Sequence, residues 1–347
     1  YARTMGDREV RPLVNGLITS RELWSCTTCR ACMQVCPVLI DHIPAIVDLR
    51  RHLVLSEGQP PDEAAPVLEK MTQQGNPWGF PRGQRLKWAE DAGLHVPLMA
   101  DKGQADVLYW VGCAGAYDPR NQEVSRAMVA ILQAADIDFA VLGQEESCTG
   151  DSARRMGEEY VYETLALGNM ETLKQYKFNR IVTACPHCFQ ILGADYSQFG
   201  ADWQVVHHSD FINQLLQAGR LTVAGNGSAA ITYHDACYLG RHHGKYDVPR
   251  DVIAAATGTG TRPVEPSLAR EQSFCCGAGG GNMWYELEAD QRINLARFDQ
   301  LSDTGAGIIA TACAFCLIML DDACKVRGRE ADIQVKDIAE LIAEGIS

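Results

Sequence analysis

Short apolar runs alternate with longer amphipathic stretches from Asp106 to the end of the chain. The short runs are rich in β-branched and aromatic residues, and the longer stretches repeat their apolar positions at helical spacing, as βα units require. The pattern predicts strands over Val107–Val111, Phe139–Leu142, Ile181–Thr183, Val205–His207, Ala230–Tyr233, Ile308–Thr311 and Ile333–Val335. It predicts helices over Arg120–Ala135, Arg154–Lys174, Asp210–Ala218, Met283–Gln300 and Phe315–Arg327.

The residues before Asp106 show a different pattern. Apolar residues recur at helical spacing over Ile46–Leu55, and six prolines between Pro60 and Pro97 divide the following residues into short segments. Proline interrupts helices, so short helices and turns are expected here. The N-terminal region is therefore predicted to be a small helical domain that ends in loops.

The α/β region is an internal duplication, which its cysteines reveal. The cysteines pair at nearly constant offsets: Cys113 with Cys237 (124 residues), Cys148 with Cys275 (127), Cys185 with Cys313 (128) and Cys188 with Cys316 (128). The run Ile-Val-Thr-Ala-Cys-Pro-His-Cys also matches Ile-Ile-Ala-Thr-Ala-Cys-Ala-Phe-Cys. We therefore expect three domains, over residues 1–104, 105–226 and 227–347.

Composition and charge narrow the function classes. Apolar residues make up 46% of the chain and charged residues 22%, which is typical of a globular protein. The net charge is −13 without blocks of like charge, so no nucleic-acid partner is expected. The densest apolar stretch, Ala312–Leu320, is far shorter than the about 20 residues of a spanning helix.

The start of the chain adds an expectation about its location. The first residue is Tyr1, no signal-peptide pattern follows, and the first cysteine motif comes early, at Cys26. We therefore expect sequence to be missing upstream. A cytoplasmic location is predicted, peripheral on the membrane through a partner or through the missing segment.

The fourteen cysteines favour metal binding over disulfides. Disulfide-rich chains are small and secreted, whereas this chain is long, lacks a signal peptide and carries its cysteines in CxxC pairs. The run Cys26-x2-Cys29-x2-Cys32-x3-Cys36-Pro37 has the spacing of a bacterial ferredoxin loop, which binds a [4Fe-4S] cubane. Zinc is disfavoured because its knuckles are paired CxxC units separated by a longer loop.

The role of Cys36 has two interpretations. In two-cluster ferredoxins the fourth cysteine of such a run ligates the other cluster. Either Cys36 completes its own cluster, or it serves a cluster whose other ligands lie in a missing upstream segment, and we favour the second.

The two repeats differ by one cysteine. The second repeat has five, Cys237, Cys275, Cys276, Cys313 and Cys316, which is one more than a cubane needs and suggests an opened, non-cubane cluster. The first repeat has Thr149 in place of Cys276, so Cys113, Cys148, Cys185 and Cys188 suit an ordinary cubane. These ligands are predicted at the carboxyl ends of the strands and at helix N-termini, where thiolates are favoured. Gly277, Gly279, Gly280 and Gly281 are expected to let the backbone approach the metal.

Other residues near the cysteines are weaker candidates. His187 lies inside a CxxC pair and His234 lies three residues before Cys237, so either could hydrogen-bond to a sulfide or relay a proton, or simply bond to a loop backbone. The doublets His207-His208 and His242-His243 lack ligand spacing and are expected to face solvent or lie in loops. Cys324 lies outside the motifs and is expected to be a buried thiol.

The motifs resemble those of a known family. Residues 106–347 look like the cysteine-rich CCG repeats of the B and D subunits of heterodisulfide reductase, and residues 20–105 look like the ferredoxin part of its fused members. The runs that carry the resemblance are Leu-Trp-Ser-Cys-Thr-Thr-Cys (23–29), Gly-Asn-Pro-Trp-Gly (75–79), Glu-Ser-Cys-Thr-Gly-Asp (146–151), Cys-Pro-His-Cys-Phe (185–189), His-Asp-Ala-Cys-Tyr-Leu-Gly-Arg (234–241) and Cys-Cys-Gly-Ala-Gly-Gly-Gly (275–281).

The resemblance implies a fold and a set of functions. The fold would be a helical ferredoxin-type domain followed by two duplicated Rossmann-like α/β domains. The function would be iron–sulfur electron transfer between an electron-transfer flavoprotein or a hydrogenase and a membrane quinone-binding subunit or upstream membrane domain. Two alternatives stay open, a heterodisulfide reductase catalytic subunit and the iron–sulfur subunit of a glycolate or lactate dehydrogenase. Whether the chain itself catalyses a reaction is left open.

Overall fold

The N-terminal region of the structure, a computed structural model that describes residues 12–225, 230–285 and 292–346, consists of short helices. In α1, the Thr19 hydroxyl accepts the Glu22 amide at 3.2 Å and the Glu22 carboxylate accepts the Thr19 amide at 2.8 Å, which forms a capping box. The helices are α1 (Ser20–Trp24), α2 (Ala31–Val35), α3 (Ile43–Arg51), α4 (Ala64–Gln74), α5 (Lys87–Glu90) and α6 (Met99–Lys102), with a π-helical turn at His52–Ser56 and a 3-10 turn at Arg82–Gln84.

The first repeat folds around a parallel sheet with strand order β2-β1-β3-β4. Its strands are β1 (Gln104–Trp110), β2 (Phe139–Ala140), β3 (Lys177–Thr183) and β4 (Val205–His207). The C-terminal halves of β1 and β3 are buried, as expected of a parallel sheet that helices cover on both faces. The helices are α7 (Gly112–Tyr117), α8 (Pro119–Ala134), α9 (Asp151–Met156), α10 (Glu159–Leu173), α11 (Pro186–Gly193) and α12 (His208–Gln217).

The second repeat copies this arrangement in a smaller sheet. The strands β5 (Ile231–Tyr233), β6 (Ile308–Thr311) and β7 (Gln334–Asp337) are parallel in the order β5-β6-β7. A parallel bridge from Thr232 to Val264 stands where β2 lies in the first sheet. The helices are α13 (Gly240–His243), α14 (Asp247–Ala256), α15 (Ile293–Ser302), α16 (Ala314–Val326) and α17 (Ile338–Ala343).

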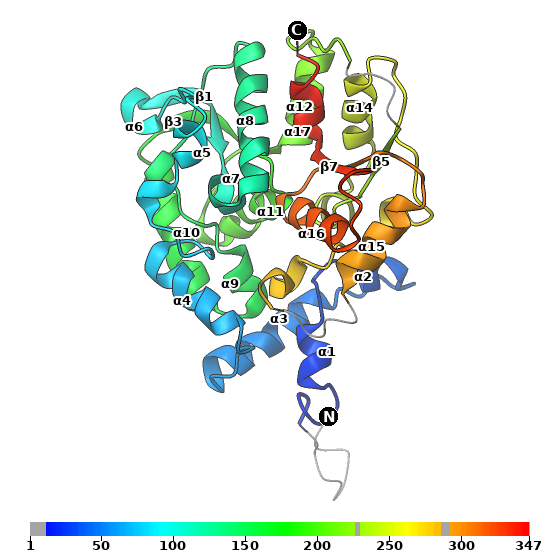
Figure 1. Cartoon of the computed structure of the whole chain (residues 1–347). Helices are drawn as coiled ribbons and strands as arrows, with labels where there is room; N and C mark the ends of the chain where they lie inside the picture. Colours follow the sequence, from blue (N-terminus) through cyan, green and yellow to red (C-terminus); the bar gives the residue numbers. More distant parts are fainter. Residues whose placement is uncertain (1–11, 226–229, 286–291, 347) are drawn as a thin grey trace, which may run out of the picture.

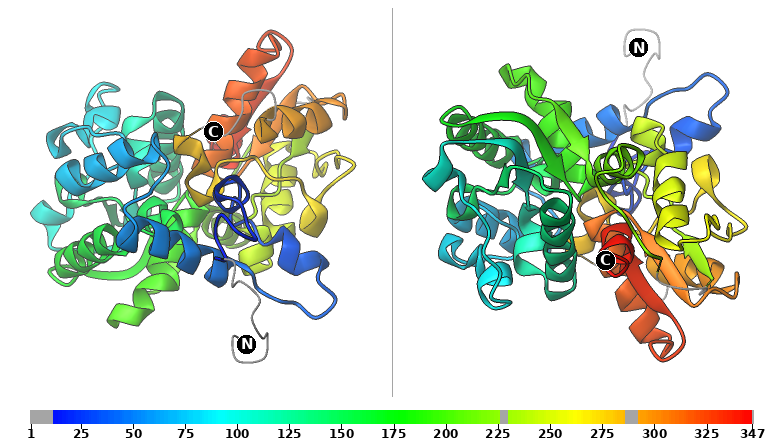
Figure 2. Two further views of the ribbon diagram at one scale, coloured as in Figure 1. Left: turned by 90° about the horizontal axis from the view of Figure 1, so that it is seen from below. Right: turned by 90° about the horizontal axis from the view of Figure 1, so that it is seen from above.

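The two repeats lie side by side, with α1, α2 and α3 below them and α4, α5 and α6 along the first repeat (Figures 1 and 2). Helix α8 of the first repeat packs on α17 of the second, while α14 of the second packs on α12 of the first. Polar bonds cross the same interface, because Arg120 pairs with Glu340 at 2.8 Å and His208 Nε2 lies 2.8 Å from Asp337. The predicted duplicated α/β architecture with a helical N-terminal region is confirmed. None of the described helices is both long and apolar enough to cross a bilayer.

Two predicted helices differ from the structure. The helix expected over Arg154–Lys174 is two helices, because the chain turns at Gly157, whose φ is +87° and whose added Cβ would lie 2.4 Å from the Arg51 amide nitrogen. The helix expected over Met283–Gln300 begins only at Ile293 in the described residues, and positions 286–291 lie outside them. The predicted domain limits stay predictions. Strand β1 begins at Gln104, and residues 226–229 lie outside the described part of the chain.

Candidate iron–sulfur centres

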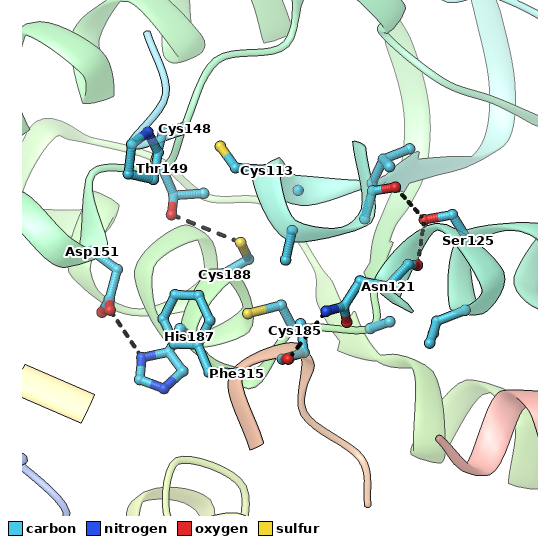
Figure 3. Close-up of a pocket in the computed structure, with 18 of the residues that line it drawn as sticks. Cys113, Asn121, Ser125, Cys148, Thr149, Asp151, Cys185, His187, Cys188 and Phe315 are labelled. Carbon is cyan, nitrogen blue, oxygen red and sulfur yellow. Dashed lines mark hydrogen bonds and ion pairs between the residues drawn. The ribbon is translucent and has the colours of Figure 1, made fainter. Parts of the chain in front are cut away.

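The four cysteines of the first repeat face one cavity at the carboxyl ends of β1 and β3 (Figure 3). Cys113 lies on the first turn of α7, Cys148 lies in the loop before α9, and Cys185 and Cys188 lie at the N-terminus of α11. All four are buried, and the thiols of Cys113 and Cys148 are in contact, as are those of Cys185 and Cys188. The other walls of the cavity are largely apolar and include Trp78, Val124 and Phe315.

Hydrogen-bond donors point at three of these sulfurs. Thr149 Oγ1 lies 3.8 Å from Cys188 Sγ, the Gly150 amide lies 3.4 Å from Cys148 Sγ, and the Arg85 guanidinium lies 3.8 Å from Cys113 Sγ. A hydrogen bond from Cys188 and the nearby charge of His187 lower the pKa of Cys185 to about 7, against the effect of burial. The pKa of Cys113 is also lowered, whereas hydrogen bonds to Cys113 and Cys185, together with burial, raise the pKa of Cys148 and Cys188. One cysteine of each pair is therefore favoured as the thiolate, which is the form that binds metal.

The five cysteines of the second repeat also come together. Cys276 Sγ and Cys316 Sγ lie 3.3 Å apart, Cys237 contacts Cys275, and Cys313 contacts Cys316. Cys313 is the N-cap residue of α16, as Cys185 is of α11. The predicted position of the CxxC pairs between a strand and a helix agrees with the structure.

Thr149 and Cys276 occupy corresponding positions in the two repeats. Each faces the second cysteine of its CxxC pair, Thr149 toward Cys188 and Cys276 toward Cys316. The fifth thiol of the second repeat thus has a hydroxyl counterpart in the first repeat.

The ferredoxin-type loop lies against the second repeat. The Cys29 thiol contacts the Cys275 thiol, and this hydrogen bond together with burial raises the pKa of Cys29. Burial raises the pKa of Cys26, and the charges of nearby Cys29 and exposed Cys32 raise it further. The Thr28 amide, which lies 3.4 Å from Cys26 Sγ, acts in the opposite direction.

Cys36 has different surroundings from the other three cysteines of its loop. The backbone amides of Ile40 and Val38, with a smaller contribution from Leu39, lower the pKa of Cys36. Its thiol thus interacts with amides of the segment that follows it, whereas Cys26 and Cys29 have other cysteines as neighbours. The assignment of Cys36 to a separate cluster stays a prediction.

The glycine run serves a purpose other than the predicted one at two positions. A Cβ on Gly279 would lie 2.2 Å from the Thr27 carbonyl oxygen, and a Cβ on Gly280 would lie 2.2 Å from that of Cys26. These glycines therefore allow close packing of the second repeat against the ferredoxin-type loop.

The two candidate histidines lie beside the thiols, with protein partners. His187 Nδ1 lies 2.8 Å from Asp151. Burial lowers the pKa of His187, but the charge and hydrogen bond of Asp151, together with the charges of Cys313 and Cys185, raise it to about 9. Its ring stacks on Tyr238 at 4.0 Å and packs near Phe315. His234 Nδ1 accepts from Arg297 at 3.0 Å, and burial holds its pKa well below the usual value. His234, Cys276 and Cys316 have their ligand atoms within 4.8 Å of one another.

The expectation for one histidine doublet was wrong. His207 and His208 are fully buried at the end of β4, where His208 bonds to Asp337 across the repeat interface. His242 is half-buried and its Nε2 lies 3.0 Å from the Thr28 carbonyl oxygen, so it contacts the ferredoxin-type loop. Cys324 is buried, and its thiol lies 3.5 Å from the Ile333 carbonyl oxygen, as expected for a structural thiol.

Two arginines that the sequence did not single out contact the cysteine loops. Arg85 contacts Cys113, and Arg50 donates to the Cys26 carbonyl oxygen at 2.7 Å. Neither lies in a cysteine motif, so only the tertiary fold reveals them.

The donor sets fit iron–sulfur clusters. Thiolates converge in each repeat, amide and hydroxyl donors point at sulfur, and the first-repeat cavity is largely apolar. These are the surroundings that thiolate-bound clusters use.

Comparisons with known proteins agree with this interpretation. The CCG cysteine-rich domain model matches residues 107–193 and 231–321, about half of the chain. The chain is 45% identical to a "Probable membrane-anchored ferredoxin" of Chromohalobacter salexigens, over 95% of this chain and 49% of that protein. It is 40% identical to the EtfAB:quinone oxidoreductase of Syntrophomonas wolfei, over 96% of this chain and 48% of that protein.

A third relative is covered over most of its length. The chain is 30% identical to the D-type subunit of the dihydromethanophenazine:CoB–CoM heterodisulfide reductase of Methanosarcina barkeri, over 99% of this chain and 83% of that protein. By contrast, the chain spans about half the length of the two relatives above. Because both repeats match the domain and the reductase protein is similar over most of its length, the chain belongs to the family of CCG cysteine-rich-domain iron–sulfur proteins that includes the D-type heterodisulfide reductase subunits.

Proposed function

We propose that this chain transfers electrons within a membrane-associated oxidoreductase, between a flavoprotein or hydrogenase and a quinone. The observation that carries the proposal is the contact of the ferredoxin-type loop with the second repeat, where Cys275 Sγ lies 3.4 Å from Thr27 Oγ1 and close to Cys29. Two cysteine groups far apart in the sequence thus meet inside one protein. Bound iron–sulfur clusters supply one-electron redox chemistry, and the protein sets their spacing and potentials.

The first repeat is joined to this pair by packed aromatic rings. His187, between the two CxxC cysteines of the first repeat, stacks on Tyr238, which follows Cys237 of the second repeat. The Tyr238 hydroxyl lies 2.8 Å from that of Thr28, in the ferredoxin-type loop. Side chains of all three cysteine groups therefore meet in one packed junction, which suits a relay of centres.

The cluster types follow from the cysteines present. We assign a cubane to the ferredoxin-type loop, a cubane to the four cysteines of the first repeat and a non-cubane [4Fe-4S] cluster to the five of the second. Cys36 would ligate a further cluster held by a cysteine run outside this sequence, and that run would in turn supply the fourth ligand of the ferredoxin-type cubane, as in two-cluster ferredoxins.

The partners are inferred from the relatives. One relative is named for EtfAB and quinone and another is named as membrane-anchored, so a flavoprotein of the electron-transfer type is the favoured donor and membrane quinone the favoured acceptor. The chain would then lie on the cytoplasmic face of the membrane, held by a partner subunit or by a segment outside this sequence.

A heterodisulfide reductase is the second candidate, favoured by the similarity to the Methanosarcina barkeri reductase protein over 83% of its length. Opening of a cluster by a fifth thiolate would allow disulfide chemistry at the second repeat. Thr149 leaves the first repeat with four cysteines, so a pair of such sites is not available in this chain. Electron transfer is therefore preferred.

The test uses the natural full-length protein in membrane vesicles. Addition of reduced electron-transfer flavoprotein, or of a hydrogenase with hydrogen, should reduce the clusters and then a quinone analogue, as followed by EPR and absorbance. Turnover of a thiol heterodisulfide, with no reduction of quinone by either donor, would reject the proposal in favour of the reductase.

A further inference from the structure

Arg85 extends from the N-terminal region into the first-repeat site. Its side chain is 2% exposed, and its two terminal nitrogens lie 3.8 and 3.9 Å from Cys113 Sγ. Glu146 pairs with the same guanidinium and accepts the amides of Val111 at 3.1 Å and Gly112 at 2.8 Å. The carboxylate thereby fixes both Arg85 and the turn that carries Cys113.

The buried arginines of the second repeat have different partners. Arg297 donates to His234 Nδ1 at 3.0 Å, and Arg250 forms an ion pair with Asp235 at 2.7 Å. In the first repeat, by contrast, the guanidinium itself lies on a ligand sulfur, and Thr149 adds a hydroxyl near Cys188. Arg241 also places its charge near Cys237 and Cys275, but its nitrogens donate to the carbonyl oxygens of Cys29, Glu271 and Ser273. The two repeats therefore differ in whether a guanidinium bonds to a ligand sulfur.

A donor on a ligand sulfur stabilises the reduced form of a cluster, because reduction adds negative charge that the thiolates share. The effect is strong at Arg85 because the side chain is buried and solvent screens its charge little. Pairing with Glu146 weakens the net charge, but the N–H groups still point at sulfur.

We propose that Arg85 raises the reduction potential of the first-repeat centre and so makes it an electron-accepting site in the relay. The inference deepens the proposed function and rests on it, because it requires a redox centre in the first repeat. Arg85 acts by holding its guanidinium against the Cys113 sulfur, which changes the potential of the bound centre.

The experiment is an EPR-monitored redox titration of the full-length protein and its variants. R85Q/E146Q removes the buried pair together and leaves no unpaired carboxylate, while R85K keeps the charge but loses the forked contact. R126Q is the matched control, because Arg126 donates to the Trp88 carbonyl oxygen at 2.9 Å and thus holds the same N-terminal region without a thiol contact. The signal lost in C185S identifies the first-repeat centre.

The proposal predicts a shift in the midpoint potential of the first-repeat centre alone. At the potential that half-reduces the wild-type centre, R85Q/E146Q should lower its reduced-to-oxidised ratio at least about tenfold, which is about 59 mV for one electron. R85K should shift it less in the same direction, and R126Q and the other centres should not shift.

Several outcomes would overturn the inference. One is an unchanged midpoint potential in R85Q/E146Q with iron retained, and another is an equal shift in R126Q. A third is loss of the centre from both Arg85 variants, which would show that Arg85 is needed to assemble the centre. If R85Q/E146Q alone lost the centre, an unshifted midpoint in R85K would overturn it as well. A wild-type protein with no signal sensitive to C185S would instead reject the proposed function.

Discussion

Replacement of Arg50 by methionine should loosen the ferredoxin-type loop from both repeats. Arg50 is fully buried on α3, and its guanidinium stacks on Trp24 with 4.9 Å to the ring centroid. Burial lowers its pKa, although the charges of Tyr285 and Cys26 act in the opposite direction. Its nitrogens donate to five backbone carbonyl oxygens, those of Leu23, Trp24, Cys26, Arg155 and Gly280.

The cost follows from the hydrogen bonds that are lost, although Asn282 still donates to the Trp24 and Cys26 carbonyl oxygens and Tyr285 to that of Gly280. Six lost hydrogen bonds at about 1 kcal/mol each, partly offset by removal of a buried charge, give a destabilisation of about 3–5 kcal/mol. At about 2 °C per kcal/mol in a chain of this size, the melting temperature should fall by about 6–10 °C. The Cys26 carbonyl oxygen is one of the acceptors, so the EPR signal of the ferredoxin-type centre should broaden or disappear first.

Thermal unfolding of the loaded protein, with EPR before heating, measures both effects. The control is R327M, since Arg327 is 41% exposed and its ion pair with Asp299 lies on the surface. That change should leave the melting temperature almost unchanged, because solvent screens an ion pair on the surface. Equal melting temperatures for R50M and R327M, with the ferredoxin-type signal intact, would show that Arg50 does not hold the loop.

Three further changes test other parts of the structure. T149C should give the first repeat a fifth thiol and an EPR signal like that of the second repeat, whereas T149V should not; identical spectra for both variants would contradict the correspondence with Cys276. G157A should lower the urea midpoint by the equivalent of more than about 2 kcal/mol, because the site requires positive φ and lies against Arg51. G168A, in open space on α10, should be neutral or stabilising, and similar midpoints for both would refute the steric argument. C324A should leave the iron content unchanged in a colorimetric assay, and a loss of four irons would make Cys324 a ligand.

The fold could be predicted because the hydrophobic pattern of each segment and the spacing of the cysteines indicate the same βα framework. The β-branched runs match the strands closely, and Val205–His207 and Ile308–Thr311 have the predicted bounds. The constant offsets between cysteines predicted the duplication, because ligands of one centre follow the same βα framework in both halves. The break at Gly157 could not be predicted, since its cause is the backbone of α3, more than a hundred residues away.

The surroundings of the cysteines could be predicted only in part. Spacing predicted the three cysteine groups, since CxxC pairs at helix N-termini depend on local sequence. The contact of Cys29 with Cys275 and the approach of Arg85 to Cys113 depend on how the N-terminal region docks on the repeats. His207 and His208 were expected at the surface, but the polar doublet is satisfied by Ser209 and Asp337 inside the interface.

Iron and acid-labile sulfide analysis of the purified full-length protein, combined with EPR, tests most directly whether these thiols hold iron–sulfur clusters. About eight iron and eight sulfide should belong to the two repeats and about four more of each to the ferredoxin-type loop, and the further cluster proposed for Cys36 should add about four of each again. C276S should alter only the signal of the second repeat. Protein that passes electrons to its partner while containing zinc, or no metal at all, would contradict the account.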